Sequence, residues 1–272
     1  MPKAESLTDT LALERIEVNL FRGRAPQSQG PRIFGGLVIG QALAAAYKTI
    51  EGRLCHSLHC YFIRPGDPAI PILYEVDRAR DGRSFTTRRV TAIQHGEQIF
   101  NLAASFQVEE PGLEHQDPIP DVPAPEELPE ENGWGDWPRP IEMRPVEAWD
   151  RTRPTAAPPF QNIWMRAAHP IGEDAAVNQA VIAYASDMSF LSTAMRPHAM
   201  FWHTAGLQTA SLDHAVWFHR RANFNDWHLY AQKSPSAAGG RGFNLGEIYD
   251  RGGRLVASTA QEGLIRYRPP GR

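Results

Sequence analysis

Cysteine, net positive charge and long hydrophobic runs are all scarce in this sequence of 272 residues, and each shortage excludes a class of protein. The two cysteines, Cys55 and Cys60, are too few for a disulfide framework, and their spacing fits neither a C-x-x-C redox pair nor a zinc site. A net charge of -3 gives no broad basic surface of the kind that nucleic-acid binding requires. We therefore expect no disulfides and no nucleic-acid partner.

The sequence also lacks a membrane-spanning run. Its longest weakly polar stretch, Gly35 to Tyr47, is well short of the ~20 residues that cross a bilayer. The first residues, M-P-K-A-E-S-L-T-D-T, contain no apolar run typical of a signal peptide, and the last, R-P-P-G-R, carry no S-K-L peroxisomal signal. These features predict a cytoplasmic protein with no membrane span.

A serine-hydrolase signature is missing as well, although S-L-D-H at Ser211 places serine, aspartate and histidine within four residues. The segment is rich in β-formers, and a strand sends successive side chains to opposite faces. His214 is therefore expected to point away from Ser211, whereas a triad needs its histidine bonded to the hydroxyl. The chain has no G-x-S-x-G elbow either. Any partners of Ser211 must come from elsewhere in the chain.

Proline, by contrast, is concentrated. More than half of the 23 prolines lie between Val108 and Phe160, among runs of glutamate. Because proline fixes φ and removes a backbone donor, we predict an acidic linker at residues 111–159 that runs extended on the surface rather than building a sheet. Its aromatic residues predict that it docks on the body of the protein; these are Trp134, Trp137 and Trp149.

The same order of elements is predicted twice, once on each side of this linker. A strand (Glu17 to Arg22, then Asn162 to Ala168) precedes an apolar helix, and four strand-like runs follow each helix. The helices are expected at residues 35–48 and 176–195, the second with one charge in its middle. Each half closes on similar words, A-S-F-Q and A-S-T-A-Q, which indicates an internal duplication.

This pattern predicts an α+β fold of the double hot-dog type, with two tandem long helices each wrapped by an antiparallel β-sheet. The N-terminal hot-dog domain is expected at residues 1–110 and the C-terminal one at 160–272. Because strands do not alternate with helices in either half, a doubly wound parallel sheet is disfavoured.

Several longer motifs carry a family resemblance across both halves in order. They are I-F-G-G-L-V-I-G-Q-A-L, H-S-L-H-C-Y-F-I-R-P-G-D, D-G-R-S-F-T-T-R-R-V-T, Y-A-S-D-M-S-F-L, S-L-D-H-A-V-W-F-H-R, A-G-G-R-G-F and V-A-S-T-A-Q-E-G. On these the chain resembles the acyl-CoA thioesterase II family, the bacterial and peroxisomal double hot-dog enzymes. The resemblance implies an enzyme of fatty acid metabolism that hydrolyses fatty acyl-CoA to free fatty acid and coenzyme A. It also implies a homodimer or homotetramer.

The resemblance further implies three catalytic residues that activate water: Asp187, Ser211 and Gln261, the last two holding the water in line. Taken alone, each has a simpler structural explanation. Asp187 fits a helix cap or kink satisfied by Ser186 or Ser189, Gln261 a core amide, and Ser211 an ordinary strand hydroxyl. A nucleophilic Ser211 is a second possibility, although the sequence predicts no histidine base for it.

Two other functions on the same fold remain open. Related hydratases and dehydratases use an aspartate followed five residues later by histidine, but here Ser192 follows Asp187 and Ile72 follows Asp67 at that spacing. A non-catalytic acyl-CoA-binding protein is the other alternative. The presence of all three implied catalytic residues, Asp187, Ser211 and Gln261, argues against it.

No cofactor or metal site is expected from the sequence, and its histidines are isolated; His214 and His219 are interpreted as structural. Candidates by charge for the coenzyme A phosphates are arginines that a solvated strand face explains equally well, so none is assigned: Arg64, Arg83, Arg88, Arg89 and Arg241.

Overall fold

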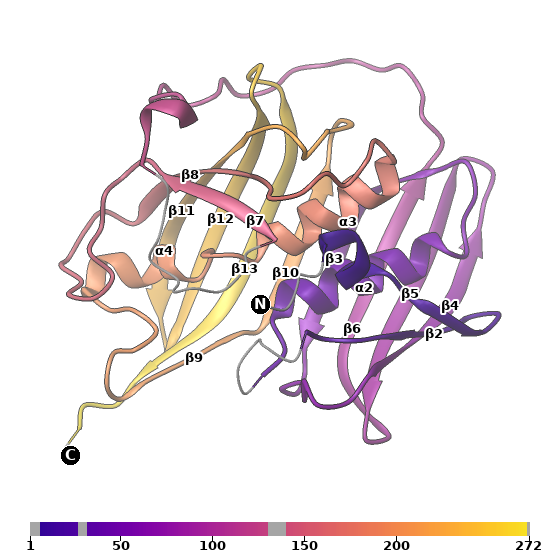
Figure 1. Ribbon diagram of the computed structural model, residues 1–272, viewed down its shortest axis with the longest axis horizontal. Helices are drawn as coiled ribbons and strands as arrows, with labels where there is room; N and C mark the ends of the chain where they lie inside the picture. Colours follow the sequence, from indigo (N-terminus) through magenta and orange to yellow (C-terminus); the bar gives the residue numbers. More distant parts are fainter. Residues whose placement is uncertain (1–5, 27–31, 130–139, 271–272) are drawn as a thin grey trace.

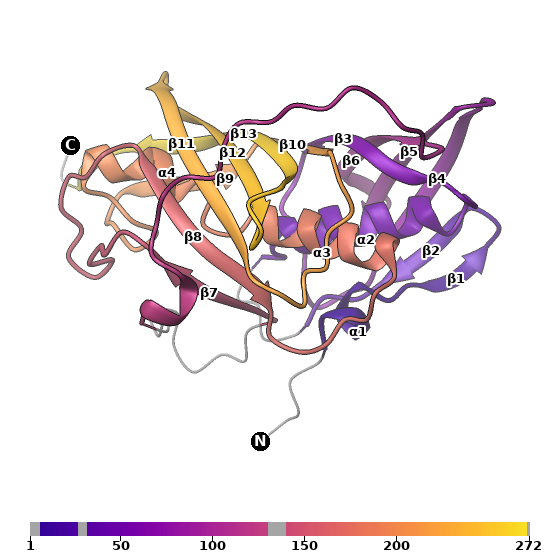
Figure 2. The same ribbon diagram turned by 90° about the horizontal axis from the view of Figure 1, so that it is seen from above.

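The computed structural model describes residues 6–26, 32–129 and 140–270. Two helices, α2 (Gly35–Tyr47) and α3 (Ala175–Ser186), lie side by side in the hollow of a large curved sheet (Figure 1). The view from above shows the strands wrapping around both helices (Figure 2). This is the predicted α+β arrangement, in which antiparallel strands enclose two long helices.

The first half of the chain contributes eight elements to this arrangement. They are α1 (Leu7–Leu11), β1 (Glu14–Glu17), β2 (Leu20–Gly23), α2, β3 (Leu54–Phe62), β4 (Ile72–Asp81), β5 (Phe85–Gln94) and β6 (Glu97–Gln107). The four strands predicted after the first helix are therefore present, and the first helix has its predicted start.

The remaining elements belong to the linker and the second half. They are a short 3-10 helix (Pro125–Glu127), β7 (Ile141–Pro145), β8 (Phe160–Ala167), α3, α4 (Ser192–Met195), a second 3-10 helix (Arg196–His198), β9 (Leu207–Ser211), β10 (Asp213–Phe218), β11 (His228–Ala238), β12 (Arg241–Asp250) and β13 (Leu255–Tyr267).

All of these strands form one sheet of 13 strands. The first half has the order β1-β2-β4-β5-β6-β3, the second half β10-β13-β12-β11-β8-β7, and β9 also pairs with β13. The halves join where β3 and β10 pair antiparallel. Read outward from this junction, β3, β6, β5, β4 and β2 correspond to β10, β13, β12, β11 and β8, so the strand order repeats as an internal duplication predicts.

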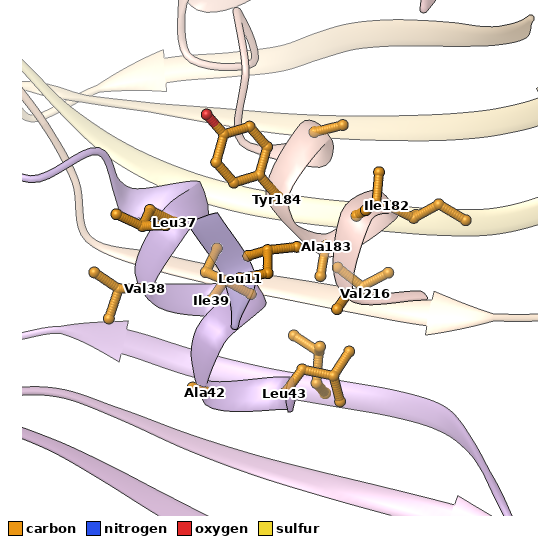
Figure 3. Close-up of a cluster of buried hydrophobic side chains, with 14 of the residues drawn as sticks. Leu11, Leu37, Val38, Ile39, Ala42, Leu43, Ile182, Ala183, Tyr184 and Val216 are labelled. Atoms are coloured by element: carbon orange, nitrogen blue, oxygen red, sulfur yellow. The ribbon is translucent and has the colours of Figure 1, made fainter. Parts of the chain in front are cut away.

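The contact between α2 and α3 explains why α2 is made of small residues. A Cβ added to Gly36 would collide with the backbone carbonyl of Tyr184, so only glycine lets the two helices approach this closely. Aliphatic side chains fill the space around the contact, and Figure 3 shows Leu11, Ile39 and Ala183 among them. The core thus crosses from one half of the chain to the other.

Two sequence expectations about local structure are wrong. The strand predicted from Glu17 to Arg22 is split into β1 and β2 by a turn at Val18 and Asn19. The helix predicted at residues 176–195 ends at Ser186, because Ser189 adopts a left-handed backbone (φ 60°) that no α-helix accommodates. A short separate helix, α4, follows. Because α3 ends at this point, Asp187 comes into contact with the neighbouring strands.

The linker also differs from its expectation on one point. Its segment β7 pairs with β8 and forms an edge of the sheet. Proline is tolerated on an edge strand, because no outer strand needs the backbone N–H that Pro145 lacks. Trp149 docks as predicted, with its indole N–H donating to the carbonyl of Thr155 and its ring edge-on to Phe201. Trp134 and Trp137 lie outside the described residues. The division into domains at 1–110 and 160–272 stays a prediction, because one sheet runs through both halves.

Candidate active site

The three residues singled out by the resemblance come together in one hydrogen-bonded cluster. Asp187 is the C-cap residue of α3, Ser211 is the last residue of β9, and Gln261 lies in β13. The Ser211 hydroxyl donates to Asp187 Oδ1 at 3.2 Å, and Gln261 Nε2 donates to the same oxygen at 2.6 Å. Ser186 does not serve as the cap, since its hydroxyl donates to the carbonyl of Ala183 at 3.0 Å.

A β-bulge brings Ser211 into this cluster. Ser211 lies opposite Gly263 on β13, whereas Ala215 lies opposite Ala260, so the register shifts by one residue at Leu212. Continuing the second register places His214 opposite Gln261. Because Gln261 and Gly263 share one face of β13, Ser211 and His214 also share a face, which corrects the expectation from strict alternation. The same bulge divides the predicted strand here into β9 and β10.

Asp187 is a buried carboxylate with a tuned affinity for protons. It is 9 % exposed, and burial raises the pKa of its carboxyl above the ordinary value. Three hydrogen bonds act against burial and lower the pKa: those from Gln261, Ser211 and the backbone N–H of Gly36. The last comes from the N terminus of α2, whose dipole also favours a negative charge. The site therefore lies between the two halves of the chain.

Gly35 provides the space for the carboxylate. A Cβ at this position would lie 2.7 Å from Asp187 Oδ2 and 2.9 Å from the ring of Phe62. The two glycines at the start of α2 thus have different roles: Gly35 leaves room for the carboxylate, while Gly36 admits the helix contact and gives its N–H to an oxygen.

We expect Gly35→Ala to lower kcat about tenfold, because the added methyl group displaces the Asp187 carboxylate from its hydrogen-bonding partners. Steady-state kinetics with thermal unfolding measures the effect. Gly112→Ala is the matched control, since a Cβ there meets nothing within 4 Å. Equal activity of the two variants would contradict the tight fit at Gly35.

His214 is the residue of the site whose part sequence reasoning missed. It is 1 % exposed, its Nδ1 lies 3.1 Å from Gln261 Nε2, and its Nε2 lies 2.8 Å from Ser186 Oγ. Burial lowers its pKa to about 3, so the ring is neutral. The interpretation as a buried structural histidine is right about its burial but missed its contact with Gln261. Only the register of β10 against β13 reveals that contact.

Within the residues that the structure describes, the first half carries no copy of this cluster. Its strand β3 has the corresponding register shift between Cys55 and Ser57 against β6, and beyond it Leu58 lies opposite Ala104. Leu58 and Ala104 thus occupy the positions that His214 and Gln261 hold in the second half. All three of Cys55, Leu58 and Ala104 are buried and apolar. The duplicated fold therefore presents one polar cluster of this kind within the described residues.

Three of the arginines considered for coenzyme A phosphates have acidic partners. Arg64 pairs with Glu97, Arg88 with Asp81 and Arg241 with Glu262. Arg88 is buried and lines a basic cavity of about 420 Å³ at the C-terminal end of α2, the opposite end from Gly35. These contacts explain the arginines structurally. Over the described part of the chain, no three histidine, cysteine or acidic side chains group as a metal site.

Comparisons with known proteins agree with one another. Residues 138–264 match a family model described as acyl-CoA thioesterase, and residues 24–107 match one described as acyl-CoA thioesterase N-terminal domain. The chain is 38% identical to acyl-CoA thioesterase 2 of Haemophilus influenzae (96% of this chain, 97% of that protein). It is 41% identical to human acyl-coenzyme A thioesterase 8 (97% of this chain, 89% of that protein).

Solved structures give the same picture. The structure superposes on the crystal structure of an acyl-CoA thioesterase II from Mycobacterium marinum with a TM-score of 0.82 at 41% identity, covering 98% of this chain and 100% of that one. A hot-dog protein from Alicyclobacillus acidocaldarius, at 21% identity, has a TM-score of 0.80 and covers 96% and 98%. The hot-dog fold predicted from the sequence is confirmed.

Proposed function

The chain belongs to the acyl-CoA thioesterase family and is an acyl-CoA thioester hydrolase, and from this premise we propose that it hydrolyses fatty acyl-CoA with a water molecule activated by Asp187. The observation that carries the proposal is the convergence of Ser211 and Gln261 on one oxygen of a buried carboxylate. A buried carboxylate with a raised pKa is a stronger base than a surface one, as general-base catalysis requires.

The proposed reaction has two steps. The Asp187 carboxylate takes a proton from water while the water oxygen bonds to the thioester carbon, giving a tetrahedral intermediate. The carbon–sulfur bond then breaks, the carboxylic acid forms, and the proton held by Asp187 passes to the leaving thiolate of coenzyme A. Gln261 orients the water, Ser211 holds the Asp187 carboxylate that receives the proton, and the N terminus of α2 supplies positive potential beside the developing oxyanion.

Release of free thiol from short, medium and long acyl-CoAs tests this function. Thioester cleavage with at least one chain length is the expected result, and the panel also reports the preferred length. Intact thioesters throughout, in a preparation whose folding is verified by circular dichroism, would contradict it. In that case direct binding of acyl-CoA would distinguish a non-catalytic binding protein.

Ser211→Ala is expected to retain partial activity, with kcat lowered about tenfold, because it removes one hydrogen bond but leaves the base in place. Ser211→Thr keeps the hydroxyl and is expected to match the unchanged protein, which makes it the control. Initial rates of thiol release measure both variants. An acyl group found on Ser211 by intact mass spectrometry after acid quenching would instead establish covalent catalysis.

We further propose a homodimer or homotetramer that acts in the cytoplasm. Large apolar side chains project from the outer face of the two junction strands, namely Tyr61 and Trp217, the latter with His59 packed edge-on against it. Contact between two such faces would cover this surface. Sedimentation velocity measures the oligomeric state, and a monomer at micromolar concentration would contradict the proposed oligomer.

As for membranes, the described residues contain no helix with the length and apolar character that a bilayer span requires.

A further inference from the structure

A continuous chain of buried hydrogen bonds runs from the end of α3 through His214 to Gln261. The Ser186 hydroxyl bonds the carbonyl of Ala183 and His214 Nε2, and His214 Nδ1 bonds Gln261 Nε2. Ser186 and Gln261 are both 0 % exposed, and His214 is 1 % exposed. The side chains of Ser186 and His214 therefore bond each other without competition from bulk solvent.

The donors and acceptors of this chain have a fixed direction. A hydroxyl has one proton, and Ser186 uses it on Ala183, so Ser186 accepts the proton of His214 Nε2. A neutral imidazole carries one N–H, which leaves Nδ1 as an acceptor. Gln261 must therefore present its NH2 group to His214.

This direction decides which end of the Gln261 amide is free. Its two N–H groups are taken by Asp187 Oδ1 and His214 Nδ1. Its carbonyl Oε1 is buried and has no hydrogen-bond partner among the described residues, a costly arrangement for a core amide. The reversed amide would set Oε1 against both the Asp187 carboxylate and the His214 lone pair, so it is excluded electrostatically.

We propose that His214 is a positioning residue for hydrolysis: it locks the Gln261 amide so that Oε1 accepts a hydrogen bond from the attacking water. The water then gives one proton to Asp187 and holds the other toward Gln261 Oε1, which leaves an oxygen lone pair directed at the thioester carbon. This inference rests on the proposed function of Asp187, and it assigns the carbonyl of Gln261, rather than its NH2, to the water.

Two substitutions of His214 separate this role from packing. Asparagine places an acceptor oxygen close to the position of Nδ1, whereas glutamine keeps the length and the contact with Ser186 but has carbon at the δ position. We expect His214→Gln to lower kcat about 30-fold with KM within about twofold, and His214→Asn to stay within about threefold of the unchanged protein in kcat. Thiol-release kinetics and thermal unfolding are measured together for both.

Equal kcat for the two variants, whether both high or both low, would overturn the role of His214. Ser186→Ala provides a test that leaves the ring in place: the lost acceptor frees the tautomer of His214, and we expect kcat to fall about threefold at constant KM. An unchanged kcat in that variant would also contradict the inference.

Asp187→Asn is measured alongside to separate this inference from the proposed function. An active Asp187→Asn protein would overturn the proposed function itself. An inactive Asp187→Asn protein together with a fully active His214→Gln protein would overturn only the role of His214.

Discussion

Replacing Asp187 by asparagine is expected to lower kcat about 10³-fold, because the amide has nearly the shape of the carboxylate but accepts no proton. The donors from Ser211 and Gln261 still find an oxygen at position Oδ1. The N–H of Gly36, which favours the ionised carboxylate, loses its negative partner, while the cost of burying a charge disappears. These two effects oppose each other, so we expect a melting temperature within a few degrees of the unchanged protein.

The matched control is Asp174→Asn, at the other end of the same helix. Asp174 caps α3 by accepting the N–H groups of Ala176 and Val177, and asparagine caps a helix equally well. Full activity in this variant together with a loss in Asp187→Asn would locate the effect at the cluster. A kcat of Asp187→Asn within tenfold of the unchanged protein would exclude Asp187 as the general base.

The position of the cluster between the two halves has a consequence for the predicted domains. Asp187, Ser211 and Gln261 all lie in the range predicted for the C-terminal domain, but Gly36, which donates to Asp187, and Gly35, which leaves room for it, belong to the first half. The first half also covers one side of α3, because its helix α2 packs against that helix. The N-terminal repeat, whose described residues form no such polar cluster, therefore completes the site of the second.

The sequence was most informative where structure depends on local composition. The run of small and aliphatic residues from Gly35 predicted an apolar helix, and most of α2 is indeed buried. The repeated order of strands predicted the duplicated fold, which the pairing of β3 with β10 joins into one sheet. The three site residues came from the family resemblance, since each alone had a simpler explanation.

What the sequence missed depends on contacts between distant segments. The bulge at Leu212 is a property of β9 and β10 pairing with β13, roughly 50 residues away, and one shifted residue reverses every face assignment beyond it. The end of α3 depends on the positive φ of Ser189, a conformation that serine rarely adopts. The first error hid the contact between His214 and Gln261, and the second hid the position of Asp187 at the C-terminal end of α3.

Activity is expected to fall on the acid side by about tenfold per pH unit once the pH is below the pKa of Asp187, because only the ionised carboxylate takes a proton from water. Burial raises that pKa, so the fall begins at higher pH than for an exposed aspartate. The neighbouring groups stay neutral through this range: His214 has its pKa lowered to about 3, and the pKa values of Cys60, Tyr184 and Tyr230 are raised. The dependence of kcat/KM on pH measures the limb.

Ser211→Ala identifies the group responsible for this limb. The Ser211 hydroxyl lowers the pKa of Asp187, so its removal is expected to move the limb to higher pH. An unmoved limb would assign it to another carboxyl group such as Asp213, whose pKa is also raised.

The raised pKa of Asp187 also makes the stability of the protein depend on pH. A folded-state pKa above the unfolded value gives a contribution that is fully present below the unfolded pKa and is lost as the pH rises through the folded one. Asp187→Asn, which does not titrate, should therefore gain stability relative to the unchanged protein as the pH rises through that window, and a constant difference in the free energy of unfolding would show that the pKa of Asp187 is not raised.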